Sequence, residues 1–185
     1  PALWGVAVAW IAWGRRRALE LVGSLLKLRV PPKFYAMALL YPPGVALVSL
    51  GILRVVGLNH EIEFDFREPS RAEFAWLSFQ ISVAEEVAWV GFVLAALAHR
   101  YRLFQASVAT GVLWGVWYIP LVLADIQVTP GLPVFPLLIN FASIAAICAW
   151  LYLRTQSAAV VAIMQITTNY TTQLIPVLPQ RGGLT

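Results

Sequence analysis

Long apolar runs occupy most of this chain and restrict what it can fold into. Five of them are long enough, or nearly so, to cross a bilayer: residues 34–56, 72–98, 103–124, 132–153 and 157–178. A transmembrane helix needs about 20 apolar residues. In lipid, only helices and closed barrels satisfy every backbone hydrogen bond, and the polar–apolar alternation that a barrel requires is absent. The runs therefore predict an all-α, polytopic bundle of transmembrane helices.

A sixth apolar run, residues 2–13, is too short to cross a bilayer by itself. Because the chain begins with proline rather than methionine, we expect this run to be part of a helix that starts further upstream. The sequence thus predicts about six spans, the first truncated, in one membrane-embedded domain over residues 1–185. The composition agrees, since 12% of the residues are charged, against ~25% in soluble domains. The single cysteine, Cys148, excludes an intrachain disulfide and a CxxC metal site.

Charged residues are unevenly distributed among the segments between the runs. Residues 14–33 carry six basic and one acidic side chain, residues 57–73 carry five acidic and two basic ones, and residues 99–102 carry two arginines. Basic loops usually face the cytoplasm, so we expect a bacterial inner (cytoplasmic) membrane protein with residues 14–33 and 99–102 inside. Leucines interleave with the basic residues of 14–33, which predicts an amphipathic segment on anionic lipid. The positive charge therefore indicates a lipid partner and not nucleic acid.

Two adjacent carboxylates, Glu85 and Glu86, lie inside the apolar run 72–98. An ionised carboxylate in mid-bilayer costs at least ~2.5–3.5 kcal/mol on insertion scales. Two such neighbours also repel each other, so at least one is expected to be protonated or paired. Successive helical residues point about 100° apart, so only one of the two faces a given cavity directly. Acids in this position are usually functional, but a structural hydrogen-bond pair that fastens helices together explains them equally well.

Three motifs on and after this run resemble those of the CAAX-protease and bacteriocin-processing (CPBP, or Abi) family of intramembrane metalloproteases. "EEVAWVGF" is similar to the family's EExxxR motif, "LWGVWYIP" to the surroundings of its FxxxH motif, and "SAAVVAIMQITTN" to the helix that carries HxxxN after a serine. The resemblance covers a core of residues 72–172. It implies a zinc-dependent endopeptidase that cuts prenylated or bacteriocin-like peptides within the membrane, with a glutamate of the first motif as general base.

The chain departs from these motifs at the positions that the resemblance assigns to the metal and its surroundings. Tyr118 and Gln165 stand at the two histidine positions, and Val90 stands at the arginine position of the first motif. The polar residues that remain are Glu85, Glu86 and Asn169. Zinc prefers Cys, His and carboxylate ligands, so no cofactor is expected unless the chain is an active protease. Tyr118, Gln165 and Asn169 are instead expected to donate hydrogen bonds to the carboxylates.

Three functions remain open at this point. The first is a catalytically inactive homologue that acts as a membrane scaffold, an assembly factor or an accessory subunit of a larger membrane complex. The second is an active intramembrane metalloendopeptidase with an unusual site. The third is a proton- or cation-coupled protein that uses Glu85 and Glu86. Ligation of a haem or chlorophyll by His60 or His99 is a further alternative, although a loop or interfacial histidine is more often simply solvated.

Overall fold

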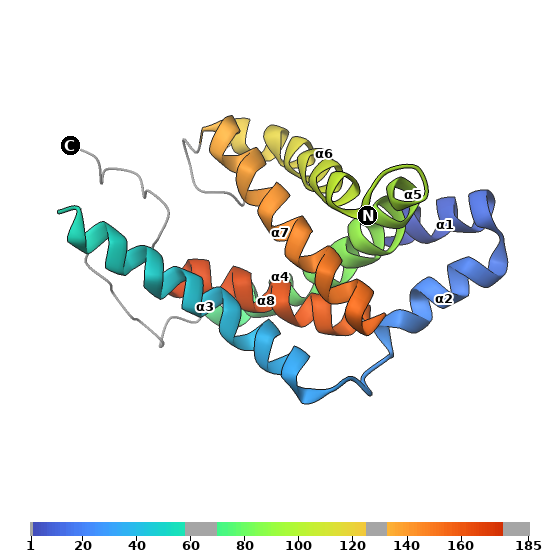
Figure 1. The fold of residues 1–185 in the computed structure, drawn as a ribbon, viewed down its shortest axis with the longest axis horizontal. Helices are drawn as coiled ribbons and strands as arrows, with labels where there is room; N and C mark the ends of the chain where they lie inside the picture. The colour runs from blue at the N-terminus through green and yellow to red at the C-terminus, as the bar shows by residue number, and fades with distance from the viewer. Residues whose placement is uncertain (1, 58–69, 125–132, 176–185) are drawn as a thin grey trace.

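The computed structural model describes residues 2–57, 70–124 and 133–175, and all regular structure in these ranges is helical (Figure 1). The all-α prediction is therefore confirmed for the described residues. The elements, in chain order, are α1 (Ala2–Trp13), α2 (Arg15–Leu25), α3 (Pro32–Val55), α4 (Ser70–Glu86), the π-helix η1 (Val87–Leu94), α5 (Ala95–Ala98), α6 (Leu103–Leu123), α7 (Val134–Thr155) and α8 (Ala158–Leu174).

Four helical segments are long and apolar enough to cross a membrane. They are α3, α6, α7 and the continuous segment Trp76–Ala98, to which α4, η1 and α5 contribute. By contrast, α1 has 12 residues and α8 has 17, so both fall short of the about 20 residues of a full span. Of the six predicted spans, four are thus supported, and the helix expected over residues 157–178 ends at Leu174.

The π-helix η1 lies at the centre of the bundle. It contacts α1, α2 and α4, which precede it in the chain, and α6, α7 and α8, which follow it. Around it, α6 packs mainly against α7, while α3 and α4 both pack against α8 (Figure 1). The residue before η1 is Glu86, the last residue of α4. The fold therefore places Glu85 and Glu86 where the helices that precede η1 contact those that follow it.

Glycines allow α6 and α7 to approach closely. A Cβ atom added at Gly111 would lie 2.5 Å from the carbonyl oxygen of Phe141, and one added at Gly115 would lie 2.8 Å from Cδ2 of Leu138. Membrane helices associate largely through such close packing at small residues, because lipid supplies no hydrophobic force between them. The position of Tyr118, one turn after Gly115 on α6, therefore depends on this contact.

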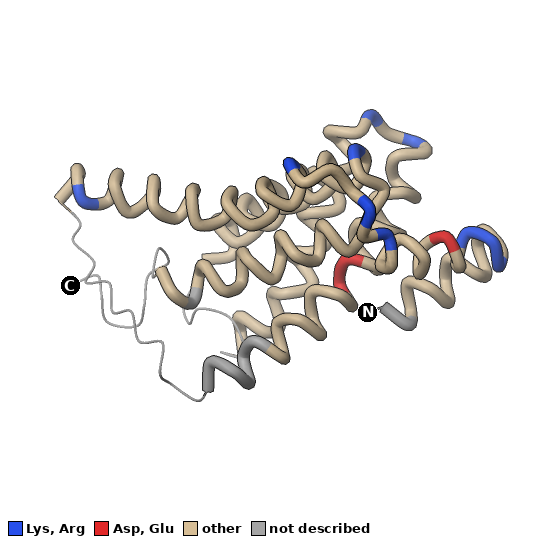
Figure 2. The backbone as a smooth tube through the Cα atoms, turned by 90° about the horizontal axis from the view of Figure 1, so that it is seen from below, with Lys and Arg blue, Asp and Glu red and all other residues tan. Residues whose placement is uncertain are grey.

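Most of the basic residues lie at one end of the bundle (Figure 2). They lie on α2, in the linker to α3 and the first turn of that helix, in the turn between α5 and α6, and in the last turn of α7. At the other end of α3, Arg54 lies in the last helical turn, about 30 Å from Lys33 at the 1.5 Å rise of an α-helix. The amphipathic segment expected in residues 14–33 is α2, whose Ala18, Leu21 and Ser24 are buried.

Candidate functional site

Glu85 and Glu86 are both buried, with 3% and 0% of their surface exposed. The ion pairs in the described part of the chain are both made by Glu20, so neither buried carboxylate has a cationic partner there. A carboxylate in such a place must obtain its stabilisation from hydrogen-bond donors. The donors come from helices that are distant in sequence.

Both carboxylate oxygens of Glu85 accept a hydrogen bond. The Tyr118 hydroxyl of α6 donates to Oε1 at 2.8 Å, and the Gln165 amide of α8 donates to Oε2 at 2.8 Å. The hydrogen bonds predicted for these two side chains are therefore present. Together they connect α4, α6 and α8 through one carboxylate.

The prediction that Asn169 donates to a carboxylate is wrong for the described residues. Its Nδ2 atom donates to the Ser82 hydroxyl oxygen at 3.4 Å. Gln165 pairs with Glu85, while Asn169, one turn later on α8, pairs with Ser82, one turn earlier on α4. The two helices thus run antiparallel here, which moves the asparagine away from the acids. Sequence reasoning missed Ser82, although its i, i+3 spacing to Glu85 places it on the same helical face.

Glu86 lies in less polar surroundings than Glu85. Its Oε1 atom is 4.0 Å from the Sγ atom of Cys148 on α7. Val90 is buried in the apolar cluster that also contains Cys148 and Leu151. Four buried side-chain atoms have no hydrogen-bond partner among the described residues: Glu86 Oε2, Gln165 Oε1, Trp89 Nε1 and Trp114 Nε1.

Aromatic rings of η1, α6 and α7 pack next to Tyr118, the hydrogen-bond donor to Glu85. Trp89 of η1 stacks on Trp114 of α6, with ring centroids 6.0 Å apart and an interplanar angle of 17°. Phe141 of α7 packs against Trp114 and against Tyr118, at 5.3 and 4.7 Å between centroids. These contacts fix the Tyr118 ring beside Glu85 and fill the space between α6 and α7 with apolar surface.

The residues present do not fit a zinc site. Within residues 2–57, 70–124 and 133–175, no three His, Cys, Asp or Glu side chains lie together as possible ligands. Catalytic zinc usually takes three such ligands, and the amide and phenol groups of Gln165 and Tyr118 already donate to Glu85. His99 follows α5 and is exposed, with its ring edge against Trp13 at 6.3 Å. His60 lies outside the described residues.

Fold and site together define a helical membrane protein with a hydrogen-bonded carboxylate pair at its centre. A family model described as "Type II CAAX prenyl endopeptidase Rce1-like" matches residues 68–171, more than half of the chain, and the chain therefore belongs to this family. The chain is also similar to CAAX prenyl protease 2 of Methanococcus maripaludis, at 24% identity over 76% of this chain and 54% of the relative. It thus spans about half the length of that curated relative.

Proposed function

We propose that this chain is a catalytically inactive member of the Rce1-like family that serves as a scaffold, an assembly factor or an accessory subunit in a membrane complex. The observation that carries the proposal is the hydrogen bonding of Glu85, whose two oxygens accept from Tyr118 and Gln165 at 2.8 Å each. These are the two side chains that the motif resemblance aligns with the family's histidines. In place of metal ligands, the chain has donors that bind the acid itself.

The chemistry of these donors supports loss of catalysis. A general base needs a water molecule within hydrogen-bond reach, and Tyr118 and Gln165 each occupy one of the acceptor sites of Glu85 that could bind it. Neutral amide and phenol groups are poor substitutes for the imidazole and carboxylate ligands that zinc prefers. Val90, which packs in the apolar cluster, supplies no positive charge to a reacting group.

The same hydrogen bonds support a structural role for the site. They join α4, α6 and α8, which the chain connects only through long segments. Buried polar groups that find partners can fix which helices associate in a membrane. A membrane subunit that binds other proteins needs such a fixed arrangement and needs no turnover.

A cleavage assay tests the loss of catalysis. The purified full chain, in nanodiscs with added zinc, is incubated with a prenylated CAAX peptide, and CAAX prenyl protease 2 serves as the positive control. We expect no cleavage above the level of the Glu85→Ala variant. Cleavage by the wild-type chain that this substitution abolishes would establish the active metalloendopeptidase alternative.

The accessory role has its own test. An affinity-tagged full chain is crosslinked in the membranes of its native host, and the products are quantified. We expect a defined membrane protein to be recovered at a fixed stoichiometry, and to be recovered equally with Glu85→Gln if that variant stays folded. Recovery of the chain alone, in every crosslinking condition, would contradict a role in a complex.

A proton- or cation-binding function is the second candidate, and Glu86 favours it. This residue is fully buried, and its Oε2 atom has no hydrogen-bond partner among the described residues. Intramembrane acids of this kind mark ion pathways in many membrane proteins. Proteoliposomes that contain the chain distinguish this candidate, because it requires a pH-dependent ion flux that Glu86→Gln removes.

A further inference from the structure

We propose that the basic end of the bundle is a binding surface for anionic phospholipid headgroups, with α2 as its main contact. By the basic end we mean the basic residues of α2, the α2–α3 linker, the start of α3, the α5–α6 turn and the end of α7, which are Arg15, Arg16, Arg17, Lys27, Arg29, Lys33, Arg100, Arg102 and Arg154. This inference does not depend on whether the chain is a protease, because it uses none of the residues around Glu85.

The helix α2 is held against the bundle by one face. Ala18 and Leu21 pack in an apolar cluster with Val87 of η1 and Ala9 of α1. The fit is close, since a Cβ atom added at Gly91 of η1 would lie 2.5 Å from Cδ1 of Leu21. The face of α2 that points away from the bundle is therefore held in a fixed orientation relative to η1 and α1.

The outward face of α2 combines apolar and basic side chains. Leu19 is 58% exposed and Leu26, just after the helix, is 79% exposed, while the three arginines of the first turn are also exposed. Exposed leucines beside arginines are unfavourable in water but fit the boundary between acyl chains and headgroups. Long arginine side chains can keep their charged ends at the headgroup level while their stems lie in apolar surroundings.

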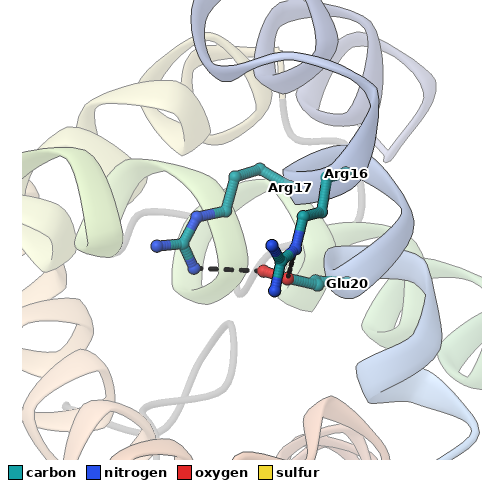
Figure 3. Close-up of polar contacts among 3 residues, drawn as sticks. All are labelled: Arg16, Arg17 and Glu20. Atoms are coloured by element: carbon teal, nitrogen blue, oxygen red, sulfur yellow. Dashed lines mark hydrogen bonds and ion pairs between the residues drawn. The ribbon is translucent and has the colours of Figure 1, made fainter.

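Glu20 organises two of these arginines (Figure 3). It accepts from Nε of Arg16 at 3.0 Å and from a terminal nitrogen of Arg17 at 3.1 Å. Each guanidinium group has five N–H donors, so most of them remain free to bind phosphate, which arginine recognises in a bidentate manner. Arg15 makes no ion pair among the described residues. It lies with Arg16, Leu19 and Glu20 around a shallow, open depression of the surface.

Other contacts at the basic end are of the kind found at a membrane–water interface. The Lys33 ammonium lies 5.2 Å from the ring centre of Phe34, and the Arg154 guanidinium lies 6.0 Å from that of Trp150. Aromatic rings beside basic residues at helix ends are typical of the headgroup region. The Ser157 hydroxyl donates to the Lys27 carbonyl at 2.6 Å, which joins the α2–α3 linker to the start of α8. The basic residues of several elements thus meet one leaflet together.

The test measures lipid binding by the purified full chain in detergent, titrated with phosphatidylglycerol or with phosphatidylcholine. We expect tighter binding of phosphatidylglycerol, with an affinity that falls as the salt concentration rises. The triple variant Arg15→Gln, Arg16→Gln, Arg17→Gln should weaken this binding by roughly fivefold for each charge removed. The matched control is Arg54→Gln, which removes an exposed arginine at the other end of α3 and should leave the affinity unchanged.

Three results would overturn the proposal. The first is equal affinity for phosphatidylglycerol and phosphatidylcholine. The second is a loss of affinity in Arg54→Gln as large as that in the triple variant. The third is binding of soluble glycerol phosphate as tight as that of phosphatidylglycerol, which would indicate a site for free phosphate. If the triple variant does not fold, Arg15→Gln alone gives the same test, because Arg15 makes no ion pair in the described part of the chain. Its affinity for phosphatidylglycerol should fall while that of Arg54→Gln does not.

Discussion

Glu85 shows how a buried acid is accommodated when no cationic side chain among the described residues pairs with it. Two neutral donors on two other helices each supply a hydrogen bond of 2.8 Å to it. In the low dielectric of the bundle such bonds are stronger than in water, and an unpaired polar group is correspondingly costly. The arrangement therefore stabilises the packing of three helices as long as both donors are present.

Replacing Tyr118 by phenylalanine tests this directly. The change removes the hydroxyl that bonds Glu85 and leaves a buried carboxylate oxygen without its donor, so Tyr118→Phe should reduce the free energy of unfolding by about 1–3 kcal/mol. Thermal unfolding of the purified chain in detergent measures the loss. Tyr101→Phe, at a position that is 55% exposed, is the control and should have no effect. Equal stability of the two variants would mean that the hydrogen bond contributes nothing.

The sequence predicted that Tyr118 and Gln165 donate to a carboxylate, but not that Glu85 accepts from both, nor the rest of the network. Tyr118 and Gln165 could be predicted because the motif resemblance implies that both side chains lie near the acids. The partner of Asn169 could not, because it depends on the relative register of α4 and α8. That register is set by packing along both helices, and a shift of one turn exchanges Glu85 for Ser82.

At the scale of elements, η1 is the feature that the sequence did not predict. The run 72–98 is apolar on all sides apart from its few polar residues, so its hydropathy does not distinguish the period of an α-helix from that of a π-helix. An uninterrupted α-helix is then the expected structure, because π-helices are rare. The structure has π-helix over Val87–Leu94, directly after the two acids. Such segments are rare and frequently occur at functional sites. In this chain, η1 contacts the helices on both sides of the acids.

The contact between α6 and α7 gives a prediction for helix packing. Gly111→Ala places a methyl group against the α7 backbone at Phe141 and Ala142, so the helices must separate, at a cost of about 1–3 kcal/mol in unfolding free energy. Gly51→Ala in α3, where no atom lies within 4 Å of an added Cβ, should be neutral or stabilise by up to about 1 kcal/mol. Unfolding in detergent compares them, and similar stabilities would show that α6 and α7 do not need this close approach.

The start of α8 gives a second prediction for an element. The Ser157 hydroxyl caps α8 by accepting from the Val160 amide at 3.3 Å, and it also donates to the Lys27 carbonyl. Ser157→Ala loses both contacts and should destabilise the chain by about 1–2 kcal/mol. Hydrogen exchange should also become faster at the first turn of α8. A control, Ser143→Ala, removes an exposed serine whose hydroxyl bonds only its own helix, and it should change neither quantity.

At the scale of the whole molecule, the helical architecture could be predicted from the sequence more accurately than the number of spans. The runs correctly indicated α3, α6, α7 and the segment Trp76–Ala98, because a span leaves a direct signal in hydropathy. Shorter elements such as α1 and α8 leave a weaker signal. Their ends depend on neighbouring helices, and α8 ends several residues before its apolar run does.

The charge distribution predicts how the chain is oriented in its membrane. The basic end should face the cytoplasm and Arg54 the opposite side. In intact cells, a membrane-impermeant maleimide should label Arg54→Cys but not Arg102→Cys, and lysis should expose the latter. Both positions are exposed, while the native Cys148 is buried and should react little. Labelling of Arg102→Cys in intact cells would reverse the orientation.

Metal content tests most directly the claim that the donors around Glu85 have replaced a metal site. The full chain is purified from zinc-supplemented cells and analysed by plasma mass spectrometry beside a variant that carries Tyr118→His and Gln165→His. We expect zinc far below one ion per wild-type chain, and more in the variant, because imidazoles are good zinc ligands. One zinc ion per wild-type chain that is lost in Glu85→Ala would contradict the account.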